Sequence, residues 1–245
     1  VMSTLVGLAR DRGLLGLDDP VSDHLPAGWT NAAAAEEQAI TIRHLLTMSS
    51  GLNEATLTVK AAPGTVWEYN TDAYQKLRRV VEAAAGSDIN TLSGEWLFGP
   101  IGIDSPQAWA PRPGAFATMD AVGDKAWALE LTAREMARFG LLAQRNGLWA
   151  GQQLTDPGWF AEAWTGSSRK RDYGYLWWLL GEGHFRRQGV PTDLVAALGA
   201  RDQKIYVLPS MQLVLVRQGE TARSAALAES DFDTALIAAL RDARA

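Results

Sequence analysis

Apolar residues recur at helical spacing from the first residue of the chain. Val1, Leu5 and Leu8 form one series, a second series runs beside it, and Gly13 follows as a helix end. Because the helix has apolar residues on more than one face, we expect it to be buried. No capping residue precedes Val1, so the pattern predicts a helix already under way at residue 1.

Four further segments between residues 19 and 147 carry helix signals. Each has a capping residue before it or a glycine after it, and the segments after Thr71 and Thr132 also carry an apolar stripe of period 3.6. The signals are Asp19 before Pro20, Ser50-Gly51 after residues 40–49, Thr71 and Gly86 around residues 71–85, and a capping box of Thr132 with Glu135 ahead of a helix that Gly147 ends.

The period changes after about residue 172. Residues 172–181 are rich in aromatics and predict a strand, as do residues 192–200. Residues 203–218 predict two strands around a turn at Pro209-Ser210. An apolar stripe through Phe232 then predicts a closing helix near the end of the chain.

Helices followed by antiparallel strands favour an α+β architecture over a parallel, doubly wound sheet. Repeats, low-complexity tracts and linkers are absent from the sequence. We therefore expect one domain over residues 1–245, mostly helical over about 14–170, with the sheet strands and the last helix in 172–245.

Composition narrows the classes of function. The 245 residues are 47% hydrophobic and 21% charged, with a net charge of −5 and scattered basic residues, so a nucleic acid is not an expected partner. Without cysteine, the sequence excludes disulfides, thiolate nucleophiles and zinc–cysteine sites. The longest apolar stretches fall far short of the roughly 20 residues that a membrane span needs.

Several common catalytic signatures are missing. The sequence contains no G-x-S-x-G elbow, no phosphate-binding G-x-x-x-x-G-K-[ST] loop and no H-E-x-x-H zinc helix. Its three histidines, His24, His44 and His184, lack metal-ligand spacing, and His44 inside a short helix favours a structural role. A histidine general base is therefore not expected.

A tyrosine offers another base. Tyr69 stands where the segment after Pro63-Gly64 enters a helix, close to Trp67. Such an aromatic pair more often simply packs. Tyrosine acts as a base only where positive charge lowers its pKa from about 10, and no lysine of the sequence is obviously placed to do so.

Seven segments in order resemble the serine β-lactamase-related hydrolases. They are GLLGLDDPVSDHLP, ITIRHLLTMSSGL, PGTVWEYNTDAYQKL, LFGPIGI, LTAREMARFGLLAQRNGLWAGQQL, YGYLWW and QKIYVLPSMQLVLV. The family includes class C β-lactamases, D-Ala-D-Ala peptidases, family VIII carboxylesterases and 6-aminohexanoate-oligomer hydrolases. The resemblance implies an antiparallel sheet flanked by helices, with a helical subdomain.

Two of the family's three motifs map onto this sequence. The Tyr-x-Asn motif resembles Tyr69-Asn70-Thr71, which implies that Tyr69 exchanges protons with nucleophile and leaving group, although Thr71 replaces the usual Asn. The Lys-Thr-Gly-like motif resembles Ala197-Leu198-Gly199, with Ala197 in place of the cation. The resemblance then implies that the N–H of Ala200 forms half of the oxyanion hole.

The third motif, Ser-x-x-Lys, holds the family's nucleophile. By the resemblance it is expected within one or two helical turns before Val1, so the N-terminal part of the fold is expected to be missing from this sequence or supplied by a separate chain. Ser167 and Lys170 match the motif by spacing alone, in a polar stretch that we interpret as an exposed loop. If the first assignment is correct, Val1, Tyr69 and Ala200 must converge on one cleft.

These observations predict a serine hydrolase that cleaves a small-molecule ester or amide through an acyl-enzyme, with no metal or organic cofactor. Losing the cation at Ala197 favours esters or amides over substrates held there by a carboxylate. Thr71, Trp67, Leu198 and Gly199 are the expected substrate contacts, whereas Trp177 and Trp178 either line an acyl pocket or pack in the core. The alternative is a non-catalytic penicillin-recognising or degenerate binding protein of the same fold.

Overall fold

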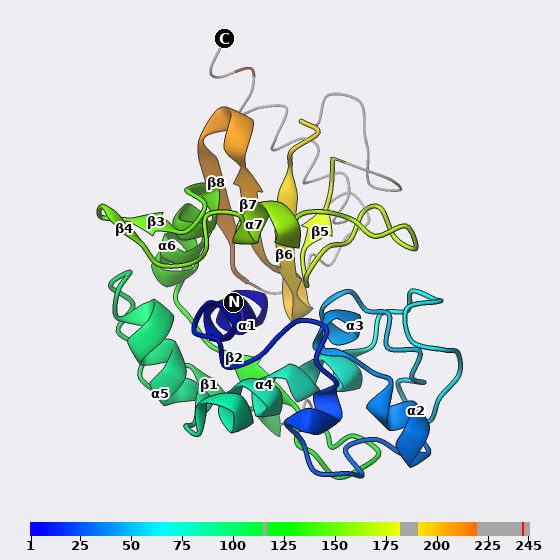
Figure 1. The fold of residues 1–245 in the computed structure, drawn as a ribbon. Coiled ribbons are helices and arrows are strands. Elements are labelled where there is room, and N and C mark those ends of the chain that lie inside the picture. Colours follow the sequence, from blue (N-terminus) through cyan, green and yellow to red (C-terminus); the bar gives the residue numbers. More distant parts are fainter. Residues whose placement is uncertain (115–116, 182–190, 220–241, 243–245) are drawn as a thin grey trace.

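Helix α1 (Met2–Asp11) lies in the middle of the molecule, between the main sheet and the long helix α4 (Thr71–Ala85) (Figure 1). The computed structural model describes residues 1–114, 117–181, 191–219 and 242. All residues of α1 from Ser3 to Ala9 are buried, as the two apolar series predict. Gly7 is required there because a Cβ would lie only 2.5 Å from the ring of Trp159.

Short helices and strands surround these two elements. The other helices are α2 (Ala34–Gln38), α3 (Ile42–Leu46), α5 (Ile89–Ser93), α6 (Ala133–Gln144) and α7 (Trp159–Ala163), with a π-helical turn at Gly94–Phe98 and 3-10 turns at Val21–Asp23, Ala200–Asp202 and Pro209–Met211. The strands are β1 (Trp109–Pro111), β2 (Trp127–Leu129), β3 (Leu148–Trp149), β4 (Gln152–Gln153), β5 (Trp178–Leu179), β6 (Val195–Gly199), β7 (Gln203–Leu208) and β8 (Leu213–Arg217).

The main sheet is antiparallel, with strands in the order β5-β6-β7-β8. Alternate side chains divide between its two faces. Val195, Ile205 and Val207 join the large core, against which α6 packs, while Ala196 and Tyr206 join a small apolar cluster. Strands β1 and β2 pair as a separate two-stranded sheet, and so do β3 and β4.

The predicted helices are confirmed where both an apolar stripe and an end signal are present. Thr132 and Glu135 form the predicted capping box of α6, and Gly86 ends α4 in the left-handed conformation. The cap of α4 was predicted one residue late, however. Asn70, not Thr71, is the N-cap, because its Oδ1 accepts the N–H of Ala73 at 2.8 Å.

Two other predictions about local structure are wrong. Asp19 does not cap a helix at Pro20, because its carboxylate accepts the N–H of Gly16 at 2.6 Å and only a 3-10 turn follows. Residues 172–181 do not form one strand, and only Trp178–Leu179 pairs with the sheet. The predicted closing helix at 230–244 lies almost wholly outside the described residues.

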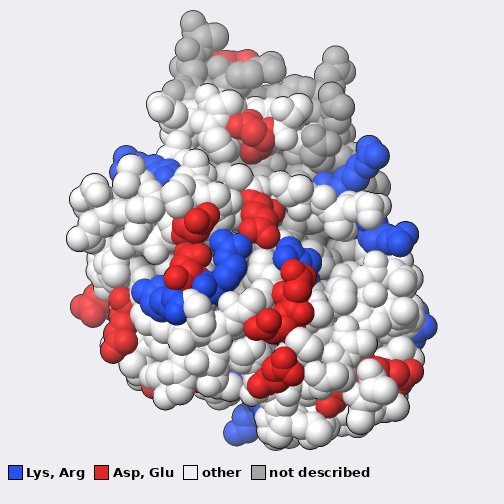
Figure 2. Space-filling model, viewed as in Figure 1, with Lys and Arg blue, Asp and Glu red and all other residues white. Residues whose placement is uncertain are grey.

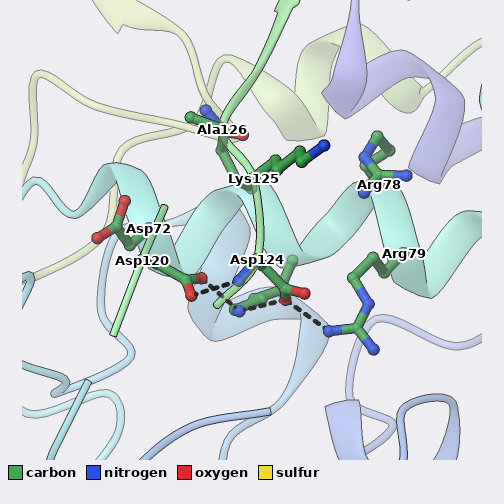
Figure 3. Close-up of a pocket in the computed structure, with 9 residues that line it drawn as sticks. Asp72, Arg78, Arg79, Asp120, Asp124, Lys125 and Ala126 are labelled. Carbon is green, nitrogen blue, oxygen red and sulfur yellow. Dashed lines mark hydrogen bonds and ion pairs between the residues drawn. The ribbon is translucent and has the colours of Figure 1, made fainter. Parts of the chain in front are cut away.

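A buried lysine fastens the loop before β2 to helix α4. Lys76, which is 1% exposed, contacts the carboxylates of Asp120 and Asp124 at 2.5 Å each. Arg79, three residues further along α4, contacts Asp124 at 2.5 Å (Figure 3). These ion pairs hold residues 117–126 against the helix whose first turn follows Tyr69.

Charges of both signs are interspersed over the face drawn in Figure 2, without a patch of one sign. An ion-pair network surrounds Glu162 of α7, which contacts Arg10 at 2.7 Å and Arg43 at 3.3 Å. Tyr175 donates to the same carboxylate at 2.8 Å. The network joins α1, α3 and α7. In the described ranges, no helix is long and apolar enough to cross a bilayer.

Candidate active site

A cavity of about 670 Å³ opens between the sheet edge, the start of α1 and the segment leading into α4. Its lining includes Val1, Tyr69 and Ala200, which come from three distant parts of the sequence. Two further walls come from β1 and β2, through Trp109 and Trp127. Val1, Tyr69 and Ala200 therefore line one cavity, as the assignment of the opening helix requires.

Tyr69 is held by aromatic neighbours. Its ring stacks on Trp178, with centroids 6.0 Å apart and planes 11° apart. The rings of Tyr173 and Tyr74 meet it edge-on at 6.3 and 6.4 Å. With its ring fixed by these contacts and 38% of the residue exposed, Tyr69 can present its hydroxyl to a molecule in the cavity.

Burial raises the pKa of Tyr69 to about 12, and neighbouring Tyr74 and Glu54 act in the same direction, whereas the Arg112 guanidinium opposes them. The phenol is therefore protonated at neutral pH in the surroundings that the described residues provide. In this state it is a hydrogen-bond donor and a proton source. It becomes a base only where a further cation lies close to its oxygen.

The backbone next to Tyr69 is anchored through Asn70, which is 1% exposed. The Asn70 side-chain amide donates to the carbonyl of Leu52 at 2.9 Å, while its Oδ1 caps α4. On the other side of Tyr69, Glu68 donates its N–H to the carbonyl of Met48 at 2.9 Å. Tyr69 therefore lies between two tethered residues, which limits how far its ring can move.

The end of β6 and the turn after it form another wall of the cavity. Leu198 and Gly199 are the last residues of β6, and Ala200 begins the 3-10 turn that follows. All three residues line the cavity. Strand β5 pairs with β6 at Val195 and Ala196, so the lining part of β6 lies beyond these paired residues.

The first turn of α1 forms the adjoining wall. Val1, Met2 and Ser3 line the cavity. Ser3 is 1% exposed, and neither its hydroxyl nor that of Thr4 has a hydrogen-bond partner among the described residues. This wall therefore carries two buried hydroxyls that the described part of the chain leaves unsatisfied.

The predicted substrate contacts divide into two groups. Leu198 and Gly199 line the cavity, and so do Trp177 and Trp178. Trp177 also packs in the core, where its ring stacks on Phe139 with centroids 6.1 Å apart. Trp177 therefore lines the cavity and also packs in the core.

Trp67 and Thr71 are not among the lining residues. Trp67 lies behind the wall, edge-on to Trp178 at 6.2 Å, and the N–H of Thr71 donates to Glu54 at 2.9 Å. Sequence reasoning missed Arg112, Tyr74, Trp109 and Trp127, which line the cavity from segments without a local motif.

The remaining candidate groups lie outside this cavity. His44 accepts the N–H of Thr41 through Nδ1 at 3.1 Å, a structural contact at the start of α3. Ser167 and Lys170 close a turn on each other, with Lys170 paired to Asp172 at 2.9 Å. Over the described residues, no group of three or more His, Cys, Asp or Glu side chains is arranged to hold a metal ion.

Comparisons with known proteins bear on the family and the fold of the chain. A model of the beta-lactamase family matches residues 1–238. The curated beta-lactamase-like protein str5 of Strobilurus tenacellus is 43% identical over 51 residues, which is 18% of this chain and 18% of that protein. The match thus spans less than a fifth of the curated relative's length.

Two solved structures share the fold. A family VIII carboxylesterase matches with a TM-score of 0.69 and 14% identity, over 98% of this chain and 80% of that one. A beta-lactamase/D-alanine carboxypeptidase from Yersinia pestis matches with a TM-score of 0.67 and 16% identity, over 98% and 81%. These likenesses confirm the predicted α+β fold, with an antiparallel sheet flanked by helices.

Proposed function

Because the chain belongs to the beta-lactamase family, we propose that it is a serine hydrolase that cleaves esters through an acyl-enzyme. The observation that carries the proposal is the single cavity shared by the start of α1, by Tyr69 and by the β6 edge at Ala200. Acyl transfer needs a nucleophile, a proton shuttle and an oxyanion site within reach of one acyl carbon. The three walls match those three needs.

The proposed nucleophile is the serine of a Ser-x-x-Lys motif on the helical turn that leads into α1. The unsatisfied hydroxyls of Ser3 and Thr4 support this place, since a continuing helix supplies carbonyl acceptors to both hydroxyls. The motif's lysine would also place a further cation beside Tyr69. Its positive charge would lower the pKa of the phenol from about 12.

The proposed reaction has two halves. Tyr69, deprotonated beside the motif's lysine, takes the serine proton while the serine oxygen attacks the acyl carbon, and the N–H of Ala200 stabilises the oxyanion. Tyr69 then passes this proton to the leaving alkoxide, which departs as the alcohol and leaves the acyl group on the serine. Water attacks the acyl-enzyme, Tyr69 takes the water proton and returns it to the serine oxygen, and the acid product leaves.

The proposed substrates are esters rather than β-lactams. Ala197 lines the cavity at the position that holds a cation in the family motif. A methyl group in place of an ammonium group cannot form a charge-assisted hydrogen bond to a substrate carboxylate. The carboxylesterase and the carboxypeptidase with the same fold, named above, give precedent for both ester and peptide chemistry. In this proposal, neither Trp67 nor Thr71 contacts the substrate.

We expect kcat/KM for p-nitrophenyl butyrate to exceed that for nitrocefin by about tenfold or more. The measurement uses the full-length protein. Ala197→Lys should raise the nitrocefin-to-butyrate ratio by about tenfold, and Ala197→Met, of similar length but uncharged, should not. A wild-type protein that prefers nitrocefin contradicts ester specificity, and binding without turnover of either compound favours the non-catalytic alternative.

A further inference from the structure

The Arg112 guanidinium lines the cavity beside Tyr69, yet the family motifs give it no role. Arg112 directly follows strand β1, and its Nε donates to the carbonyl of Trp127 on β2 at 3.3 Å. Its charge also acts on the buried Tyr74 phenol, whose pKa burial raises and Arg112 lowers. The half-buried side chain is therefore held against one wall of the cavity.

Arg112 has no acidic partner in the described part of the chain. No carboxylate oxygen there lies within 4.0 Å of its nitrogens. Glu54 acts on the pKa of Tyr69 and of Tyr74, and Asp72 acts on that of Tyr74. The Arg112 charge lowers the pKa of Asp72, but the two side chains form no ion pair. The guanidinium thus retains donors that no described carboxylate uses.

The other cations of the cavity are already engaged. Arg78 is ion-paired with Glu82 and lies over the ring of Trp127, 4.3 Å from its centroid. Arg201, on the turn after β6, also interacts with another group of the protein. Arg112 is therefore the cavity cation best placed to take a partner from solution.

The surroundings favour an anion at this point. Aromatic side chains from β1, β2 and α4 form the nearby wall, and charge interactions beside such a wall of low polarity are stronger than in bulk solvent. A half-buried guanidinium without a counterion loses hydration without compensation. Its planar fork of donors fits a carboxylate in two parallel hydrogen bonds.

We propose that Arg112 forms an anion subsite that binds a carboxylate group of the substrate. This inference rests on the proposed function and narrows it, since the preferred esters then carry a carboxylate. The subsite lies on the β1–β2 wall, not at the strand position of Ala197. A carboxylate at Arg112 would therefore approach the reacting centre from the side of Tyr69.

The test compares neutral and anionic esters in the full-length protein. The neutral probe is p-nitrophenyl butyrate. The anionic probes are mono-p-nitrophenyl glutarate, charged on the acyl side, and 4-butyryloxybenzoate, charged on the leaving-group side. For at least one of them, Arg112→Gln should lower the anionic-to-neutral ratio of kcat/KM by about 10- to 100-fold, and Arg112→Lys should recover part of it.

Arg134→Gln, a change at an exposed arginine outside the cavity, should leave both ratios unaltered. Arg112 also acts on Tyr69 through its charge, and a role confined to that effect predicts an equal loss for neutral and anionic esters. An equal loss, or no change in either ratio, overturns the proposal.

A binding measurement separates this subsite from the proposed activity. Titration calorimetry with glutarate, which cannot be hydrolysed, should show binding to the wild type and at least tenfold weaker binding to Arg112→Gln. This result stands even if no ester is turned over, in which case only the proposed hydrolysis fails. Equal glutarate affinity in the two proteins contradicts the subsite.

Discussion

Tyr69→Phe is expected to lower kcat for ester hydrolysis by about 10²–10⁴, with little change in Tm. The substitution removes the phenol oxygen that transfers the proton but keeps the aromatic ring. The stack on Trp178 and the edge contacts with Tyr173 and Tyr74 should therefore persist. Steady-state kinetics on p-nitrophenyl butyrate and a thermal melt of the same preparations give the two values.

Tyr74→Phe is the matched control, because it also removes a phenol oxygen from the cavity lining. It should lose at least tenfold less in kcat than Tyr69→Phe. The pH profile adds a readout that a structural role would not move. A rate limb that rises with pH through the Tyr69 pKa should vanish in Tyr69→Phe. Equal losses in the two variants contradict the proton-shuttle role.

Lys76→Met is expected to destabilise the fold by about 3–5 kcal/mol, because it leaves the buried carboxylate of Asp120 without its cation, and Asp124 with Arg79 alone. Asp120 is 6% and Asp124 is 30% exposed at the side chain, so water compensates the first very little. For a chain of this size the loss corresponds to a Tm lower by about 6–20 °C. Differential scanning calorimetry measures it directly.

Lys60→Met provides the matched comparison, since Lys60 and Glu68 form an ion pair with side chains 54% and 38% exposed. An exposed pair contributes about 1 kcal/mol or less. Adding Asp120→Asn to Lys76→Met should recover part of the lost stability, because one uncompensated charge is removed. A melt of Lys76→Met indistinguishable from wild type would show that this cluster does not hold the loop.

The same cluster has a pH signature. Desolvation opposes ionisation of Asp124, but its hydrogen bond to Lys76 and the charges of Lys76 and Arg79 lower its pKa on balance. A lowered folded pKa contributes stability above the unfolded value, near 4, and that contribution is lost as the pH falls through the folded pKa. Lys76→Met should therefore weaken the dependence of Tm on pH below about 4.

The sequence predicted elements whose signals are local. Helix α6 carries its capping box and stripe within fifteen residues, and α1 is buried as its two apolar series require. The cap of α4 was missed because Asn70 and Thr71 are both capping residues, and only the tertiary contact of Asn70 with Leu52 distinguishes them.

Elements that depend on distant partners were not predictable. The aromatic run at 172–181 has high strand propensity, but Leu176 adopts a positive φ of 59° and donates its N–H to Leu46. This contact takes the chain out of the sheet and opens the edge beside Leu198. Arg112 was missed for a related reason: a single arginine in a loop shows no pattern until β1 and β2 pair.

The central claim is that a serine on the turn leading into α1 attacks substrate in the cavity shared with Tyr69 and Ala200. Labelling the full-length protein with a fluorophosphonate, followed by peptide mass spectrometry, tests it most directly. The account predicts one modified serine, in a Ser-x-x-Lys sequence shortly before Val1, and slower labelling in Tyr69→Phe. Modification of Ser3 or Ser167 instead, or the absence of any labelled serine, would contradict it.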